Sequence, residues 1–222
     1  ALAVLSPEQW QLHQDAPIKI DFYLRRLKIL KQQLEALNIP LLILNIPLWK
    51  DISEQLLALC QQFQISTVHC NIETGLNEQQ RDQAVEQLLQ QHQISCEYYE
   101  DRTLFPLGSI RNQSQQPYQV FTAFKKKCYE RLLIDVPSCY PDIEVQPKQA
   151  IDISQFDLNV FAQNYQQETA NPYWPVEDKH AFELLNEFIA DRLKDYKTDR
   201  DFPAIDGTSQ LSPYLNIGIL SI

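Results

Sequence analysis

Residues 200–215 read Arg-Asp-Phe-Pro-Ala-Ile-Asp-Gly-Thr-Ser-Gln-Leu-Ser-Pro-Tyr-Leu, and this stretch near the end of the chain organises the rest. Ser212 and the proline after it predict a helix start, because proline fits the first turn and serine caps free N–H groups. Gly207 lets the backbone turn or approach another group closely. With Ser212, the hydroxyls of Thr208 and Ser209 would lie near the positive end of that helix, where an anion is stabilised. An ordinary Ser-Pro helix cap explains the same spacing.

The first two-thirds of the chain alternates short apolar runs with helical patterns. In the helical pattern from Pro17, apolar residues recur at three- and four-residue steps, and the basic residues between them indicate a solvated face. Residues 41–46 form a continuous apolar run, typical of a strand buried on both faces. Strands separated by helices predict right-handed βαβ units, that is, an α/β fold with a Rossmann-like parallel sheet flanked by helices. After a short apolar run at residues 1–5, the expected strands are 41–46, 65–70 and 94–99; the expected helices are 17–37, about 52–63 and about 77–91.

The last third of the chain is divided by prolines. Residues 118–131 predict a helix with a basic side, and we expect its lysines to be solvated. Helical periodicity then fades over residues 137–175, which we interpret as a linker. An amphipathic helix is expected over 176–194. The predicted domains are therefore an α/β domain (1–136), the linker, and the beginning of a helical domain (176–222), whose final Ser-Pro helix is expected to fray.

Composition excludes several kinds of site. The chain has only four glycines and lacks both the Rossmann Gly-x-Gly-x-x-Gly fingerprint and a Walker A loop. Its five cysteines include no Cys-x-x-Cys pair and its four histidines are scattered, so no metal site is expected; buried free thiols in a reducing cytoplasm fit better. No apolar run approaches the roughly 20 residues of a membrane span. A signal peptide is also not apparent.

The stretch at 200–215 closely resembles the flavin-binding segment of DNA photolyases and cryptochromes, in its Asp-Phe-Pro-Ala and Gly-Thr-Ser-x-Leu-Ser-Pro-Tyr-Leu motifs. In that family the Thr-Ser-x-Leu-Ser segment wraps the diphosphate of FAD, and a tyrosine shortly upstream belongs to the same site. The resemblance therefore implies that FAD is bound by a set of residues shared between that segment and the tyrosine: Tyr196, Thr208, Ser209, Leu211 and Ser212. None of them would act as an acid, base or nucleophile.

A second motif follows the strand expected at 65–70. Residues 77–82 read Asn-Glu-Gln-Gln-Arg-Asp, which resembles the antenna pocket of folate-type photolyases. The resemblance implies that Asn77 and Glu78 hydrogen-bond the pterin ring of 5,10-methenyltetrahydrofolate, which offers both donors and acceptors. On local grounds alone, Asn77 is equally well explained as a helix N-cap with Glu78 beside the helix dipole.

The resemblance covers nearly the whole chain but about half of a complete photolyase, and the family's first strand would precede Ala1. It implies the amino-terminal half of a class I deoxyribodipyrimidine photolyase, an enzyme that repairs cyclobutane pyrimidine dimers in ultraviolet-damaged DNA by light-driven electron transfer from reduced FAD. The isolated chain would be inactive. A cryptochrome-type light sensor is the alternative, and a binding module without a cofactor is a third.

The net charge of −10, from 19 basic and 29 acidic residues, argues against a free-standing nucleic-acid binder. The resemblance accounts for this conflict, because the basic DNA groove of the family is built mainly from the other half of the protein. Arg200, just ahead of the hydroxyl-rich loop, is the residue of this chain that we expect to reach DNA phosphate. We expect a monomer in the cytoplasm.

Overall fold

The computed structural model describes residues 1–156, 158 and 174–222. It groups into two compact units, the first made of Ala1–Asp51 with Glu144–Ser221 and the second of Ile52–Ile143 with Ile222. The domain boundaries expected at 136 and 175 stay predictions. Residues 157 and 159–173 of the predicted linker, Pro172 among them, lie outside the described residues.

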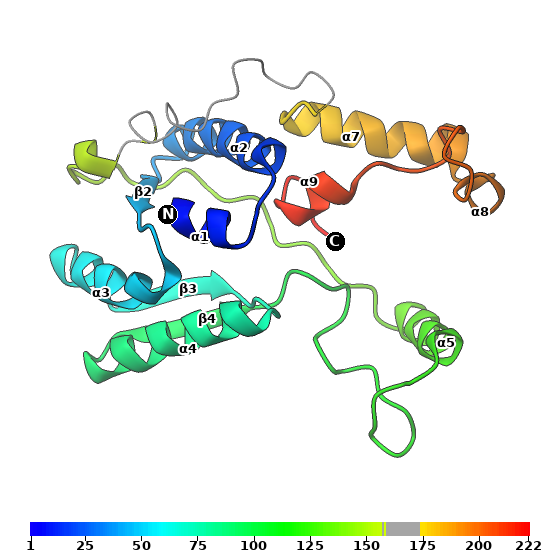
Figure 1. The fold of residues 1–222 in the computed structure, drawn as a ribbon, viewed down its shortest axis with the longest axis horizontal. Coiled ribbons are helices and arrows are strands. Elements are labelled where there is room, and N and C mark those ends of the chain that lie inside the picture. The colour runs from blue at the N-terminus through cyan, green and yellow to red at the C-terminus, as the bar shows by residue number, and fades with distance from the viewer. Residues whose placement is uncertain (157, 159–173) are drawn as a thin grey trace. The chain divides into compact units, whose positions relative to one another are not determined.

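In the first unit, the apolar run at the start of the chain forms strand β1 (Leu2–Leu5). It pairs in parallel with β2 (Leu42–Asn45), the strand expected at 41–46. Leu2 lies opposite Leu42 and Leu5 opposite Asn45. The crossover between the strands contains helices α1 (Pro7–Leu12) and α2 (Pro17–Ala36) (Figure 1). The short 3-10 turn η1 (Trp49–Asp51) follows β2. A second 3-10 turn, η2 (Ser154–Phe156), belongs to the same unit.

Helix α2 is shared by two hydrophobic cores. Leu24 and Leu27 are buried among residues of β1 and β2, with Ile20, Leu30 and Leu34 packed at the edge of this first core. The periodicity predicted this face. Phe22, on another face of α2, belongs to a second core that contains residues from the carboxyl-terminal part of the chain. The helix therefore contributes buried side chains in two directions.

The prediction of a fully solvated basic face on α2 is wrong for two arginines. Arg25 binds Asp21 at 2.8 Å and donates to the Trp174 carbonyl at 2.9 Å. Arg26 makes a bidentate pair with Asp178, and Gln33 donates to the same carboxylate. Burial opposes ionisation of Asp178, but the hydrogen bonds from Arg26 and Gln33 outweigh it and lower the pKa of Asp178. These contacts bind residues 174–178 to α2.

The carboxyl-terminal part of the first unit is helical. Helix α7 (Asp178–Glu187) continues into the π-helical turn η3 (Phe188–Arg192), and α8 (Tyr196–Asp199) and α9 (Ser212–Asn216) follow. The expected helix over 176–194 is thus shorter and changes its hydrogen bonding, with Leu193 N–H donating to the Phe188 carbonyl at 2.8 Å. The second core joins α7 and α9 to α2, and its buried residues are Phe22, Val176, Ala181, Leu211, Tyr214, Ile219 and Leu220.

The second unit also has the expected alternation. Helix α3 (Ile52–Gln62), strand β3 (Thr67–Asn71), helix α4 (Leu76–Gln91) and strand β4 (Ser95–Tyr99) follow one another, and β3 pairs in parallel with β4. Both helices lie beside this pair of strands (Figure 1). Helix α5 (Phe121–Leu132) has no buried residue, and its lysines are exposed as expected. The α/β class is confirmed, with the parallel pairing present as two two-stranded sheets.

The five cysteines are free thiols, but the expectation that they are buried holds only for Cys60. Cys139 is exposed because it lies in the irregular segment after α5, which packs little of its surface. Among the described residues, no helix combines the length and the apolar character that crossing a bilayer requires.

Candidate functional site

The tyrosine expected in the flavin site is held by its neighbours. Tyr196 begins α8 and is half-buried. The ring of Phe188, from the π-helical turn, meets it edge-on with centroids 5.7 Å apart and an interplanar angle of 87°. The guanidinium of Arg200 lies 5.6 Å from the centroid of the Tyr196 ring. Such edge-on and cation–π contacts fix the orientation of an aromatic ring.

Gly207 makes the close backbone approach that the sequence predicted. It is buried, and a Cβ atom at this position would lie 2.5 Å from the Cβ of Asp199 and 3.0 Å from its carbonyl carbon. The loop between α8 and α9 therefore folds back directly onto the end of α8. Only a residue without a side chain fits there, so Gly207 fixes the distance between Tyr196's helix and the hydroxyl-rich loop.

The start of α9 differs from the expectation in two ways. Leu211 is the N-cap, and Ser212 is the first helical residue rather than the cap. The expected fraying is also wrong, because Tyr214 is fully buried and Leu211 is 8% exposed in the second core. Burial of these two side chains stabilises a helix of only five residues. A helix this short contributes little dipole, so any anion-binding capacity must come from the loop itself.

The loop has the backbone geometry of an anion-binding nest. Gln210 has a left-handed φ of 53°, and the next residue, Leu211, is right-handed with φ −82° and ψ −11°. Successive residues of opposite hand make their N–H groups converge on one point. Within the described residues, the N–H groups of Thr208, Ser209, Gln210 and Ser212 have no hydrogen-bond acceptor, and Leu211 N–H has only the Ser209 hydroxyl at 3.5 Å. The loop therefore offers unpaired donors.

Three residues around the nest were not identified from the sequence. Arg192 donates to one oxygen of Asp206 at 2.9 Å, and the side-chain amide of Gln210 donates to the other oxygen at 2.9 Å. Arg192 comes from the π-helical turn, which periodicity cannot predict. The available signal was the Asp-Gly pair ahead of the hydroxyls, which is typical of a tight turn.

Arg200, expected to reach DNA phosphate, is exposed. It also forms an ion pair with the neighbouring Asp201 at 3.6 Å, besides its contact with Tyr196. Both contacts are local, and the guanidinium remains open to solvent. The role of Arg200 toward DNA stays a prediction.

The expected antenna residues lie in the first turn of α4, in the second unit. Asn77 is exposed and Glu78 is half-buried. The interpretation of Asn77 as an N-cap is wrong, because α4 begins at Leu76 and its N-cap is Gly75. The carboxylate of Glu78 curls back over Gly75 and occupies the space that a Cβ atom there would fill. The two residues are therefore adjacent and accessible. The missing side chain of Gly75 leaves the space that the Glu78 carboxylate occupies.

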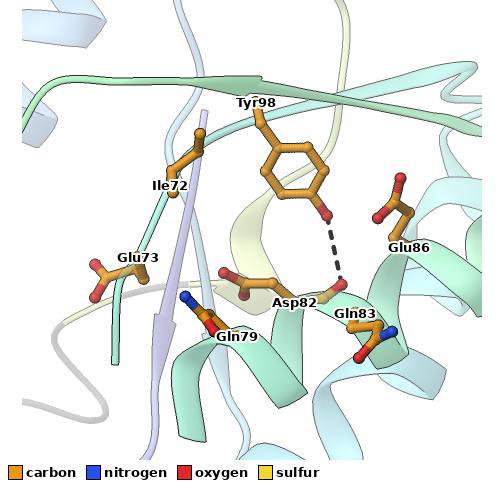
Figure 2. Close-up of a pocket in the computed structure, with 7 residues that line it drawn as sticks. All are labelled: Ile72, Glu73, Gln79, Asp82, Gln83, Glu86 and Tyr98. Carbon is orange, nitrogen blue, oxygen red and sulfur yellow. Dashed lines mark hydrogen bonds between the residues drawn. The ribbon is translucent and has the colours of Figure 1, made fainter. Parts of the chain in front are cut away.

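A separate pocket of about 180 Å³ lies between α4 and the ends of β3 and β4 (Figure 2). Figure 2 shows Asp82 and Glu86 on α4 facing Tyr98, whose hydroxyl donates to the Asp82 carbonyl at 3.4 Å. Asn77 and Glu78 do not line it, so the structure does not bring the expected antenna residues into this pocket. The complete lining is Ile72, Glu73, Gln79, Asp82, Gln83, Glu86 and Tyr98.

Burial and nearby acidic groups keep the hydroxyl of Tyr98 and the neighbouring thiol of Cys70 protonated. Burial, with added repulsion from Cys96, Cys70, Glu86 and Asp82, raises the pKa of Tyr98. Burial and the nearby Asp82 raise the pKa of the Cys70 thiol to about 11. Neither group is therefore a nucleophile near neutral pH. No set of three His, Cys, Asp or Glu side chains suited to a metal ion occurs among the described residues.

Comparisons with known proteins show which family the chain resembles. The family model for DNA photolyase matches residues 1–144. A Vibrio cholerae protein named deoxyribodipyrimidine photo-lyase is 34% identical over all of this chain and 47% of its own length. The Escherichia coli protein of the same name is 31% identical over all of this chain and 46% of its own length. The chain thus spans about half the length of the curated relatives it matches.

Solved structures share the fold. A Synechocystis cryptochrome matches with a TM-score of 0.70 at 19% identity, covering 100% of this chain and 47% of its own. A class III photolyase from Agrobacterium tumefaciens matches with a TM-score of 0.66 at 22% identity, covering 99% of this chain and 44% of its own. At such identities the likeness establishes the architecture alone.

Proposed function

Because the chain belongs to the DNA photolyase family, we propose that it is the amino-terminal half of a class I deoxyribodipyrimidine photolyase. The complete protein would repair cyclobutane pyrimidine dimers in ultraviolet-damaged DNA with light. This chain would contribute the antenna-binding domain and the first part of the FAD site. The free thiols support a cytoplasmic location.

The nest at Gln210 and Leu211 is the observation that carries this proposal. Its converging N–H groups, together with the hydroxyls of Thr208 and Ser209, suit the oxygens of a diphosphate. FAD contains such a diphosphate, so the loop fits this cofactor without relying on a helix dipole. Ser212 adds a third hydroxyl at the start of α9.

The residues of this chain hold and orient the flavin rather than react with the substrate. Tyr196, fixed by Phe188 and Arg200, would pack beside the cofactor, and buried Leu211 anchors the loop in the second core. Reduced FAD, when bound, would supply the electron that splits the dimer. No residue of the chain is proposed as an acid, base or nucleophile.

The first turn of α4 is proposed to bind the folate antenna. The Asn77 amide donates and accepts hydrogen bonds, and the Glu78 carboxylate accepts them, which matches the edge of a pterin ring. Both side chains are accessible at the start of the helix. The acidic pocket, which neither residue lines, is not part of this proposal.

Replacing Gly75 by alanine is expected to weaken binding of 5,10-methenyltetrahydrofolate about tenfold, roughly the effect of one hydrogen bond to a charged group. The new methyl group overlaps the Glu78 carboxylate and forces it to rotate, while φ −68° and ψ 147° at this position suit alanine, so α4 stays intact. Affinity is measured by antenna absorbance during titration. In a Glu78→Ala background the Gly75→Ala change should have no further effect; additive losses would contradict this account.

The contact with DNA is proposed for Arg200. Its exposed guanidinium can reach a phosphate while the stem of the side chain packs on Tyr196. The acidic charge of the chain is compatible with this only if the basic groove lies elsewhere in the complete protein. A strongly acidic second half would defeat that part of the proposal.

The decisive experiment is an absorbance spectrum of the complete protein that carries this chain, followed by illumination with dimer-containing DNA. A flavin band, a near-ultraviolet antenna band and light-dependent loss of dimers are expected. The same assay with the 222-residue chain alone should show no loss of dimers. Flavin without repair would favour a cryptochrome-type light sensor, and a protein without any chromophore would leave only a binding module.

A further inference from the structure

Asp206 is placed where an anion-binding loop should have no carboxylate. It lies two residues ahead of Thr208, in the same loop as the unpaired N–H groups. A negative charge so close to a diphosphate is unfavourable by itself. Its presence is explained if the carboxylate does structural work that outweighs the repulsion.

The contacts of Asp206 show what that work is. One oxygen accepts from Arg192 and the other accepts from the side chain of Gln210, which is the left-handed residue of the nest. A residue other than glycine resists a left-handed backbone. The hydrogen bond links the side chain of this left-handed residue to Asp206, and the ion pair with Arg192 links the same carboxylate to η3.

We propose that Asp206 is a positioning residue. Held by its ion pair with Arg192, it keeps the nest in the conformation that binds an anion before the anion arrives. The proposal rests on the function proposed above and extends it to residues outside the flavin-contacting set. Arg192 has a second effect, because its charge offsets that of Asp206 next to the ligand. Its side chain is 17% exposed, whereas that of Asp206 is 66% exposed, so the arginine is the fixed partner and the loop is the part being held.

The π-helical turn connects the two halves of the flavin site. It contains Phe188, which packs on Tyr196, and Arg192, which binds Asp206. Both side chains come from five successive residues of η3. The turn therefore contacts both Tyr196 and the loop that contains the nest, so one short backbone segment fixes the positions of both.

The test compares Asp206→Ala with Asp201→Ala. Each change removes one carboxylate from the same loop, but among the described residues Asp201 pairs only with its neighbour Arg200, and its side chain is 76% exposed. Backbone order parameters of residues 207–211 in the 222-residue chain are expected to fall from about 0.85 to below about 0.6 in Asp206→Ala and to stay unchanged in Asp201→Ala. The thermal midpoint should shift by no more than about 2 °C, since Asp206 is at the surface.

The affinity of the complete protein for FAD, and for inorganic pyrophosphate as a second probe, is expected to fall or rise depending on which effect of Asp206 dominates. Loss of a carboxylate alone would strengthen anion binding, whereas loss of the preformed nest weakens it about five- to tenfold. Asp206→Asn, which keeps one acceptor oxygen for Gln210, should recover part of the affinity.

The outcomes separate the two proposals. An ordered loop in Asp206→Ala overturns the positioning role, and so does a loosened loop that binds FAD more tightly. A loosened loop with weaker binding supports it. If the complete protein that carries this chain binds no FAD while Asp206→Ala still loosens the loop, the positioning role stands and the proposed function fails.

Discussion

Replacing Tyr214 by alanine is expected to destabilise the first unit by about 3–5 kcal/mol, the usual cost of removing a large aromatic side chain from a core. Tyr214 is fully buried, and its ring meets Phe22 at 5.6 Å, Trp174 at 6.3 Å and His180 at 5.9 Å between centroids. Its loss removes the side chain that joins α9 to α2 and α7. Chemical denaturation followed by near-ultraviolet circular dichroism measures the change.

Tyr214→Phe is the matched control, because it keeps the ring and removes only the hydroxyl. Within the described residues that hydroxyl is buried without a hydrogen-bond partner. Burial raises the pKa of Tyr214, although nearby Arg25 lowers it in part. We expect the phenylalanine variant to be at least as stable as the original protein. A loss above about 1 kcal/mol in this variant would reveal a partner for the hydroxyl and contradict the account.

Replacing Gly207 by alanine is expected to weaken FAD binding about a hundredfold, the size of effect that a 1 Å misplacement can have at a functional site. The methyl group would lie 2.5 Å from the Cβ and 3.0 Å from the carbonyl carbon of Asp199. Backbone atoms cannot rotate away as a flexible side chain can, so the whole loop must move off α8. Flavin fluorescence titration measures the affinity, and amide shifts of residues 207–212 report the displacement.

Gly218→Ala is the control that distinguishes displacement of the loop from the backbone strain that any residue with a side chain suffers at a glycine position with positive φ. Gly218 has φ 73°, which is unfavourable for alanine, but a Cβ atom there would have no neighbour within 4 Å. This variant should lose about 1 kcal/mol of stability through backbone strain. It should keep the FAD affinity. If both variants weaken binding equally, close packing of Gly207 is not the reason for the effect.

The strand and helix pattern of the fold could be predicted because it depends on local periodicity. The apolar spacing along α2 identified the face that packs on β1 and β2, and the continuous run at 41–46 identified β2. The roles of Arg25 and Arg26 could not be predicted, because their partners lie about 150 residues further along the chain. Charged residues look solvated when only their own helix is considered.

The candidate site was predictable where it depends on residue type and not where it depends on backbone geometry. Gly207 and the hydroxyls are recognisable from the sequence, and the close approach expected of Gly207 is confirmed. The left-handed Gln210 has no such signal, because glutamine is not a residue that favours that conformation. The contact of Arg192 with Asp206 depends on the π-helical turn and spans 14 residues. The binding roles of Asn77, Glu78 and the flavin residues stay predictions.

The two faces of α2 have a consequence for the order of events during synthesis. One face can pack on β1 and β2 soon after those segments emerge from the ribosome, but Phe22 on the other face needs residues 176–220. At about 5–20 residues per second, that wait lasts on the order of 10–40 s. During it, a nascent chain would carry an exposed aromatic face, which is a natural target for a ribosome-associated chaperone.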